Sequence, residues 1–298
     1  MGSVLASLLL ALLIFPSWTL SQNDRIDTFI RVDVDTVSVR VAVTDQLNRH
    51  VLGLEKHHFK IYENKIEQDL THFSSDNSPV SIGIIMDISG SMGDNILSAR
   101  TSIVRFLEQG ESSDEYFLVT FNQKSVLVQD FTSRSKNIQN EISFANPEGR
   151  TALYDSIYLG LEKLRNARNE KKALIVITDG EDNSSRYTFS ELNEVVKESD
   201  VQIYAIGERG EIGYGRSVIA QIVRLTGGRA FFPSNFKQLD YFCDLIHTEL
   251  RNQYLLGFTS TNLNFDGKWR KIGVRVNPPE GMPRLKLRAK EGYFVPKR

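Results

Sequence analysis

The sequence of 298 residues predicts an α/β protein in which a doubly wound, mostly parallel sheet is inserted into a small β-sandwich. Three observations predict this fold. Between residues 79 and 252, apolar runs of strand length alternate with segments of helical periodicity. Short segments with period-two alternation precede this region, and similar segments return after it. Alternating strands and helices indicate βαβ units, whereas period-two alternation indicates antiparallel strands with one buried face.

The flanking strands are expected in an N-terminal β module, residues 22–78, and in a C-terminal β segment, residues 253–298. Turn residues bound the alternating segments, which are Ser38–Val43, Phe59–Tyr62, Asp69–Phe73 and Lys271–Val276. Either set of strands alone would leave exposed sheet edges, which are a liability in an isolated sheet. We therefore expect the two sets to pair into one β-sandwich.

The central α/β domain is expected over residues 79–252. Its first strand, Val80–Met86, is apolar except for Ser81 and Gly83, which is typical of a strand buried on both faces. Helical patterns follow most strands, and the last of them runs from about Phe236 to Asn252. The other strand candidates are Tyr116–Phe121, Ala173–Thr178, Val201–Ile206 and Arg229–Phe232, with Ser125–Phe131 as an antiparallel edge strand. This order predicts a sheet covered by helices on both faces.

Residues 1–21 are expected to form a secretory signal peptide. The apolar run from Val4 to Phe15 is too short to span a bilayer comfortably, and Pro16 precedes Thr19 and Ser21 at the spacing of a cleavage site. No Lys or Arg precedes the run, and an uncleaved N-terminal anchor is the alternative interpretation. We expect an exported protein, periplasmic or extracellular, with no membrane insertion after signal removal.

Charge and cysteine content exclude several classes of function. The net charge of −1 comes from 36 basic and 37 acidic residues spread along the chain, so no basic face predicts a nucleic-acid partner. Cys243 is the single cysteine, which rules out an intramolecular disulfide. It lies in a helical apolar pattern, where a buried, inert thiol is the expected state.

Oxygen-bearing side chains suggest a cation site after the first strand of the central domain. Asp87, Ser89 and Ser91 alternate within Asp-Ile-Ser-Gly-Ser, and Gly90 and Gly93 permit the sharp turn that would bring them together. Such ligands suit Mg²⁺, Ca²⁺ or Mn²⁺ better than Zn²⁺. Taken alone, this segment also fits a turn followed by a helix N-cap.

Two further segments strengthen the cation interpretation. Asp179 ends another buried strand, and Thr151 opens a helix after Gly149 and Arg150. In open α/β sheets, ligands bind beyond the carboxyl ends of the strands where the winding direction reverses. Asp87 and Asp179 would therefore meet if their strands are neighbours.

These three segments resemble the metal-ion-dependent adhesion site of von Willebrand factor type A (VWFA) and integrin I domains, over roughly residues 80–250. That pattern is Asp-x-Ser-x-Ser followed by a distant Thr and a distant Asp, and all five positions are filled here, by Asp87, Ser89, Ser91, Thr151 and Asp179. The resemblance implies a Rossmann-like domain, a bound divalent cation, with Mg²⁺ preferred over Ca²⁺ or Mn²⁺, and an open coordination position for an Asp or Glu carboxylate of a partner protein. Arg150 stands where many relatives carry a small residue, so it could crowd that position or influence ligand choice. The flanking segments are similar to VWFA-related proteins of acidobacterial type.

Two other functions remain open from the sequence. In a metal-dependent hydrolase, the cation would activate water, but all five histidines fall outside the three segments and no obvious proton-transfer group accompanies them. Glu181 and Asp182 follow Asp179 and are the candidates for that role, although an exposed acidic loop is the favoured interpretation of both. A structural domain with a vestigial site is the other alternative. We favour a non-enzymatic, cation-dependent protein-binding or adhesion module.

Overall fold

The computed structural model describes residues 36–207 and 214–297, so the expected signal peptide lies outside the described residues. The central sheet has the strand order β10-β9-β8-β5-β6-β7. All neighbouring pairs are parallel except β6 and β7. The strands are β5 Val80–Asp87, β6 Glu115–Phe121, β7 Ser125–Thr132, β8 Lys171–Thr178, β9 Gln202–Gly207 and β10 Ala230–Phe231. The predicted mostly parallel sheet with an antiparallel edge strand is therefore confirmed.

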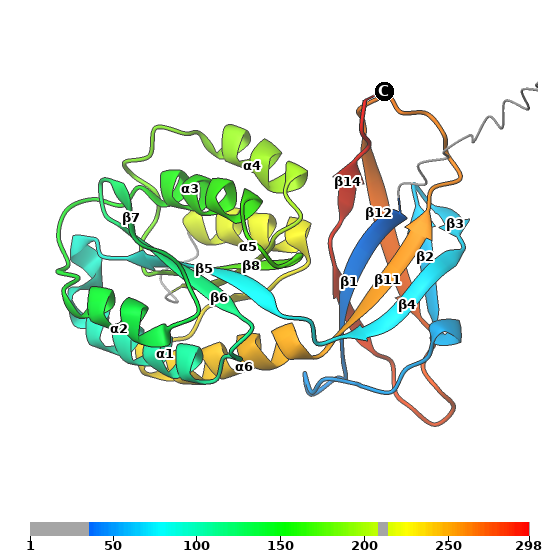
Figure 1. The fold of residues 1–298 in the computed structure, drawn as a ribbon, viewed down its shortest axis with the longest axis horizontal. Helices are drawn as coiled ribbons and strands as arrows, with labels where there is room; N and C mark the ends of the chain where they lie inside the picture. The colour runs from blue at the N-terminus through cyan, green and yellow to red at the C-terminus, as the bar shows by residue number, and fades with distance from the viewer. Residues whose placement is uncertain (1–35, 208–213, 298) are drawn as a thin grey trace, which may run out of the picture. The chain divides into compact units, whose positions relative to one another are not determined.

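Helices cover both faces of this sheet. They are α1 Ile96–Glu108, α2 Ser135–Ser143, α3 Leu153–Arg165, α4 Phe189–Glu198, α5 Tyr214–Thr226 and α6 Leu239–Arg251. Helices α1, α2 and α6 share one apolar core, and α3, α4 and α5 share the core on the opposite face (Figure 1). Helix α2 was not predicted from the sequence, because only Ile138 and Ile142 are buried in this nine-residue helix.

The buried position of β5 accounts for the mostly apolar sequence of this strand. Every residue of β5 is buried, because helices pack on both faces of the sheet. Gly83 is required there, since a Cβ atom at this position would lie 2.3 Å from Cζ of Phe117. The close packing of Phe117 on the backbone of β5 fixes the position of the strand that ends at Asp87.

The flanking strands form two antiparallel sheets, with the orders β13-β1-β11-β4 and β14-β12-β2-β3. Their strands are β1 Thr36–Thr44, β2 Phe59–Glu63, β3 Ile66–Gln68, β4 Leu70–Asp76, β11 Gln253–Thr259, β12 Trp269–Val276, β13 Lys286–Ala289 and β14 Gly292–Phe294. One apolar core joins the inner faces of both sheets. Since β1 lies between β11 and β13, and β12 lies beside β2, the predicted pairing of N- and C-terminal strands into a sandwich is confirmed.

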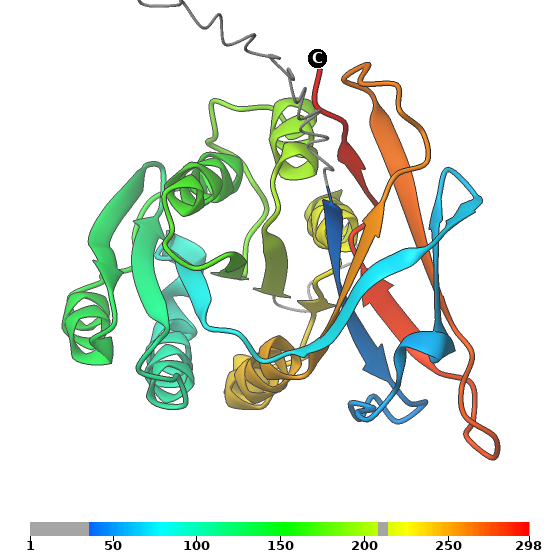
Figure 2. The same cartoon turned by 45° about the vertical axis from the view of Figure 1, so that its right-hand side comes forward.

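Two chain crossings connect the sandwich to the central sheet, namely β4 into β5 and α6 into β11 (Figure 2). Buried ion pairs accompany these crossings. Lys171 Nζ lies 3.3 Å from Asp76 Oδ2, and Arg40 Nε donates to the same oxygen at 2.9 Å. Near the end of α6, buried Glu249 pairs with Arg288 of β13. Charged groups on both sides of the junction are thus neutralised by each other.

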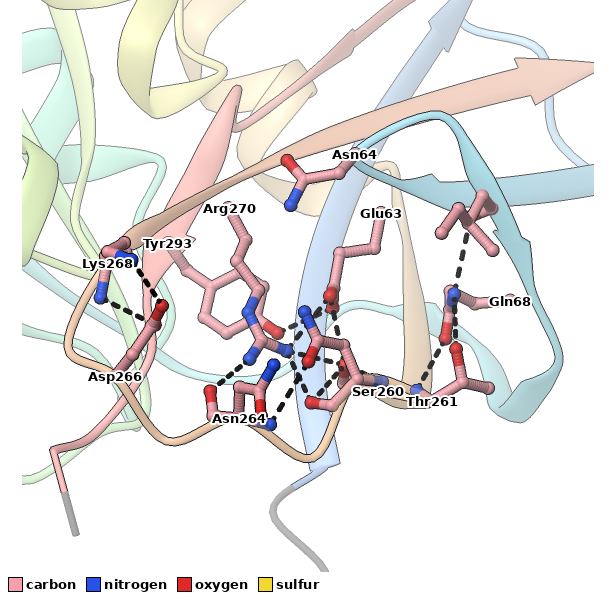
Figure 3. A network of polar contacts seen from close by, with 12 residues as sticks. Glu63, Asn64, Gln68, Ser260, Thr261, Asn264, Asp266, Lys268, Arg270 and Tyr293 are labelled. Atoms are coloured by element: carbon pink, nitrogen blue, oxygen red, sulfur yellow. Dashed lines mark hydrogen bonds and ion pairs between the residues drawn. The ribbon is translucent and has the colours of Figure 1, made fainter.

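A buried polar network holds the loop that follows β11 (Figure 3). The Arg270 guanidinium donates to Glu63 Oε1 at 3.0 Å, and the Tyr293 hydroxyl donates to Glu63 Oε2 at 2.8 Å. Arg270 also donates to three loop acceptors, which are Ser260 Oγ, the Asn262 carbonyl and the Asn264 carbonyl. The loop between β11 and β12 is therefore anchored to the sandwich by one arginine.

Three short 3₁₀ helices complete the described elements, namely η1 Lys56–His58, η2 Gly90–Asp94 and η3 Phe236–Gln238. His57 and His58 both lie in η1, where their ring centroids are 3.9 Å apart. Across residues 36–207 and 214–297, no helix combines the length and apolar character needed to cross a bilayer.

Candidate metal centre

The five predicted site residues come from three loops at one end of the central sheet. Strands β5 and β8 are parallel neighbours, and β6 lies on the other side of β5. The winding direction reverses between β5 and β8, where open α/β sheets place their ligands. Asp87 ends β5 and Asp179 follows β8 directly, so the two carboxylates lie beside this reversal point.

Asp87 is fully buried and accepts two short hydrogen bonds. Its Oδ1 accepts from the Ser89 amide at 2.7 Å, and its Oδ2 accepts from the Thr178 hydroxyl at 2.6 Å. Burial raises the pKa of Asp87 above its ordinary value, and the nearby charge of Asp179 adds to this effect. The donated hydrogen bonds oppose the rise but do not cancel it.

The two serines connect Asp87 to Asp179. The hydroxyl oxygens of Ser89 and Ser91 are 3.1 Å apart, and Ser91 Oγ donates to Asp179 Oδ1 at 2.6 Å. Ser89 is buried, whereas Ser91 is exposed. The row of oxygens therefore begins in the protein interior and ends at the surface.

Thr151 reaches the same place from the N-terminal end of α3. A Cβ atom built on Gly180 would lie 3.2 Å from Thr151 Oγ1 and 3.6 Å from Ser91 Oγ, so both hydroxyls surround this glycine. The Asn183 side chain accepts from the Thr151 amide at 2.9 Å, and the Asn183 amide donates to the Thr151 carbonyl at 2.9 Å. These reciprocal bonds hold Thr151 against the loop between β8 and α4.

Arg150 is also tied to the loop between β8 and α4. Its guanidinium donates to the Asn183 carbonyl, and its amide donates to Gln123 Oε1 at 3.3 Å. The side chain is exposed and borders the hydroxyl cluster. The structure thus places Arg150 at the rim of the candidate site, with its head group bonded to the protein.

Two residues missed by the sequence analysis take part in the arrangement. Thr178 donates to Asp87, and Asn95 Nδ2 donates to Asp179 Oδ2 at 3.1 Å. The position of Thr178 immediately before Asp179 was an available signal. Asn95 stands at the N-cap of α1 without a capping bond from its side chain, and only the fold directs it toward Asp179.

The charge around Asp87 differs from that around the other buried carboxylates. Each of the others in the described chain lies within 4 Å of an Arg or Lys nitrogen; these are Glu63, Asp76, Asp114, Glu115 and Glu249. Within the same residues, neither Asp87 nor Asp179 forms an ion pair with a basic side chain. Buried charges in proteins are normally paired or bound to metal. The site is therefore suited to a cation from solution.

The donor set is rich in hydroxyls. In the described part of the chain, no group of three or more His, Cys, Asp or Glu side chains is arranged to hold a metal ion. All five histidines lie outside the three loops, and the rings of His57 and His58 contact each other in η1. The available ligands are two carboxylates and three hydroxyls, which suit Mg²⁺, Ca²⁺ or Mn²⁺.

The chain belongs to the von Willebrand factor type A domain family, whose model matches residues 81–244. This match confirms the family resemblance inferred from the five-residue pattern. The narrower likeness to acidobacterial-type proteins stays a prediction.

Similar proteins include Cuticlin-6 of Caenorhabditis elegans, which is 27% identical over 188 residues. That alignment covers 59% of this chain and 31% of Cuticlin-6, so the chain spans less than a third of that relative. A von Willebrand factor type A structure from Catenulispora acidiphila has a TM-score of 0.53 at 11% identity, covering 80% of this chain and 72% of the other. Proximal thread matrix protein 1 from the mussel byssus has a TM-score of 0.51 at 19% identity, covering 63% and 51%. These two structures establish similarity of fold.

Proposed function

We propose that this chain is an exported, non-enzymatic protein-binding module whose contact with its partner depends on a divalent cation, preferably Mg²⁺. Membership of the von Willebrand factor type A family supports a protein-interaction or adhesion role. Family membership supports no more than this role. We add to it three proposals, which are cation dependence, export to the periplasm or the extracellular space, and the absence of catalysis.

One observation carries the proposal, namely the buried charge of Asp87 without a basic partner. The raised pKa of Asp87, caused first by burial, means that its charged form is costly in the unliganded protein. A divalent cation near Asp87 and Asp179 would offset this cost. The fit of the residues to a cation therefore rests on charge as well as on ligand type.

Asp87, Ser89, Ser91, Thr151 and Asp179 would hold the cation, directly or through water. When bound, the cation supplies a positive centre that attracts a carboxylate. Three of the five ligands are neutral hydroxyls, which leave that positive charge less compensated than an all-carboxylate site would. The exposed position of Ser91 puts the outer end of the site in reach of an Asp or Glu of a partner protein.

Calorimetric titration with Mg²⁺, Ca²⁺ and Mn²⁺ tests the cation site. We expect Asp87→Ala to abolish Mg²⁺ binding while the sheet remains folded. In the parent protein, Mg²⁺ at a hundred times its Kd should add about 2.7 kcal/mol of stability. Asp130→Ala is the matched control, because Asp130 is an exposed carboxylate on β7. Retained Mg²⁺ affinity in Asp87→Ala, with unchanged thermal stability, would refute the assignment.

The binding and hydrolase interpretations are separated by two assays. Pull-down of a partner from the native host should succeed with Mg²⁺ and fail with a chelator. Incubation with ester, phosphate and peptide substrates should give no cation-dependent turnover. Turnover that requires the cation and disappears in Asp87→Ala would favour the hydrolase.

A further inference from the structure

A groove beside the candidate metal centre has no role in the function proposed so far. Its volume is about 600 Å³, within the usual range of roughly 300–1,000 Å³ for ligand sites. Three segments distant in sequence line it: the turn between β6 and β7, the outer face of α3, and the loop between β8 and α4. The groove therefore exists only in the folded protein.

Hydrogen bonds connect the groove wall to the metal centre. Gln123, which lines the groove, accepts from the Arg150 amide at 3.3 Å. Ser184, which also lines the groove, donates through its amide to the Thr151 carbonyl at 3.1 Å. Gly149 has a φ of +78°, and a Cβ atom there would collide with Gln123 Oε1 at 1.7 Å. The groove thus begins next to the residues that position Thr151.

Two stacked tyrosines form an aromatic surface in the groove. The rings of Tyr158 and Tyr187 have centroids 4.2 Å apart and planes 18° apart. Asp155 Oδ1 accepts from the Tyr187 amide at 3.1 Å, which fixes the loop that carries this ring. Both residues are partly exposed. A rigid, partly exposed aromatic pair offers contact area at low entropic cost.

Of the four charged side chains that line the groove, one basic side chain is left for an acidic partner. Its two carboxylates are already paired, since Asp155 lies 3.3 Å from Arg186 Nε and Glu162 lies 3.1 Å from Arg165 Nη2. Lys124 is exposed and forms no ion pair within the described residues. The positive charge of Lys124 is therefore available to an acidic partner.

We propose that this groove is a second recognition site for the same partner, and that it binds an extended acidic segment carrying an aromatic side chain. One carboxylate of the partner lies at the cation, and the neighbouring part of the segment lies in the groove. There the aromatic side chain packs on Tyr158 and Tyr187, and a second acidic group pairs with Lys124. This inference rests on the proposed cation-dependent function.

A displayed library of random peptides, selected on the full chain in Mg²⁺ and eluted first with a chelator and then with acid, supplies the probe. We expect enriched peptides to combine Asp or Glu with an aromatic residue. Synthetic copies are then measured against Lys124→Glu and Tyr158→Ala, each of which should weaken binding about tenfold, the effect of losing one well-packed contact. Mg²⁺ affinity should be unchanged in both variants.

Matched controls separate a local effect from a general one. Lys136→Glu makes the same charge change on exposed α2, and Tyr241→Ala removes an exposed tyrosine of α6. Both should bind the peptides as the parent does. Because Lys124 is exposed, Lys124→Glu is expected to fold normally even if Tyr158→Ala does not.

The outcomes distinguish the groove from the cation site. Parental peptide affinity in Lys124→Glu and Tyr158→Ala, with intact Mg²⁺ binding, would overturn the groove and leave the cation site standing. Enrichment of basic peptides, or of none, would also overturn the groove. Peptides that bind without Mg²⁺ yet lose affinity in both variants would support the groove and contradict cation dependence.

Discussion

Replacement of Arg270 by Met should destabilise the protein more than most single substitutions. Arg270 is 3% exposed and donates to buried Glu63 and to three acceptors of the loop between β11 and β12. Met fills a similar volume but donates nothing. The variant therefore leaves the buried Glu63 carboxylate with only weaker, neutral hydrogen-bond donors. One of these donors is the Tyr293 hydroxyl, and burial raises the pKa of this hydroxyl to about 12.

The expected cost follows from the loss of a charge partner in a buried site. Breaking a buried ion pair by removing one partner costs about 3–5 kcal/mol. A folded domain has about 5–15 kcal/mol of net stability. For a chain of this size, about 2–4 °C is lost per kcal/mol, which predicts a fall in Tm of about 6–20 °C.

Thermal and urea unfolding followed by circular dichroism measures the effect. The matched control is Lys60→Met, which breaks an exposed pair with Glu67 and should cost less than about 1 kcal/mol. The double variant Glu63→Leu with Arg270→Met should be more stable than Arg270→Met alone, because no unpaired charge remains. If Arg270→Met unfolds like the control, the network does not stabilise the sandwich and the reasoning fails.

Three further predictions concern buried positions. Gly83→Ala should cost about 1–3 kcal/mol in urea unfolding, because its Cβ would overlap Phe117; a change below about 0.5 kcal/mol would contradict this packing. In the folded protein, burial lowers the pKa of the Lys171 ammonium from 10.5 to about 8, although the charge of Asp76 opposes this shift. At pH values between these two pKa values, the unfolded chain therefore binds more protons than the folded protein does. Stability attributable to Lys171 should therefore rise with pH across that window, and parallel stability curves for the parent and Lys171→Met would refute it. Cys243 is 2% exposed and burial raises its pKa to about 12, so a thiol reagent should label it only in denaturant, and fast labelling of the native protein would show it to be accessible.

Much of the fold could be predicted because each strand and most helices carry a local pattern. The run Val80–Met86 predicted a strand buried on both faces, and β5 is buried throughout. Helix α2 was missed because two buried isoleucines are too weak a pattern to distinguish a short helix from a loop.

The candidate site could be predicted to the extent that its residues follow strand ends. Asp87 and Asp179 stand where parallel strands finish, and strand adjacency brings them together. Thr151 was noted as a hydroxyl that opens a helix, and the family resemblance assigned it to the site, since its spacing alone carries no geometric constraint. Asn95 could not be identified, because its bond to Asp179 joins residues 84 positions apart.

The sequence by itself determined the fold class, the family and the types of ligand atom available, because periodicity and motif composition are local properties of the chain. Only the tertiary structure decided which charges are compensated. Asp87 and Asp76 are both buried aspartates near strand ends, yet Asp76 meets Lys171 and Arg40 while Asp87 meets no basic side chain among the described residues. The groove beside Thr151 likewise depends on three segments meeting in space. Charge pairing and cavities arise from contacts between distant residues, and these contacts form only when the chain folds.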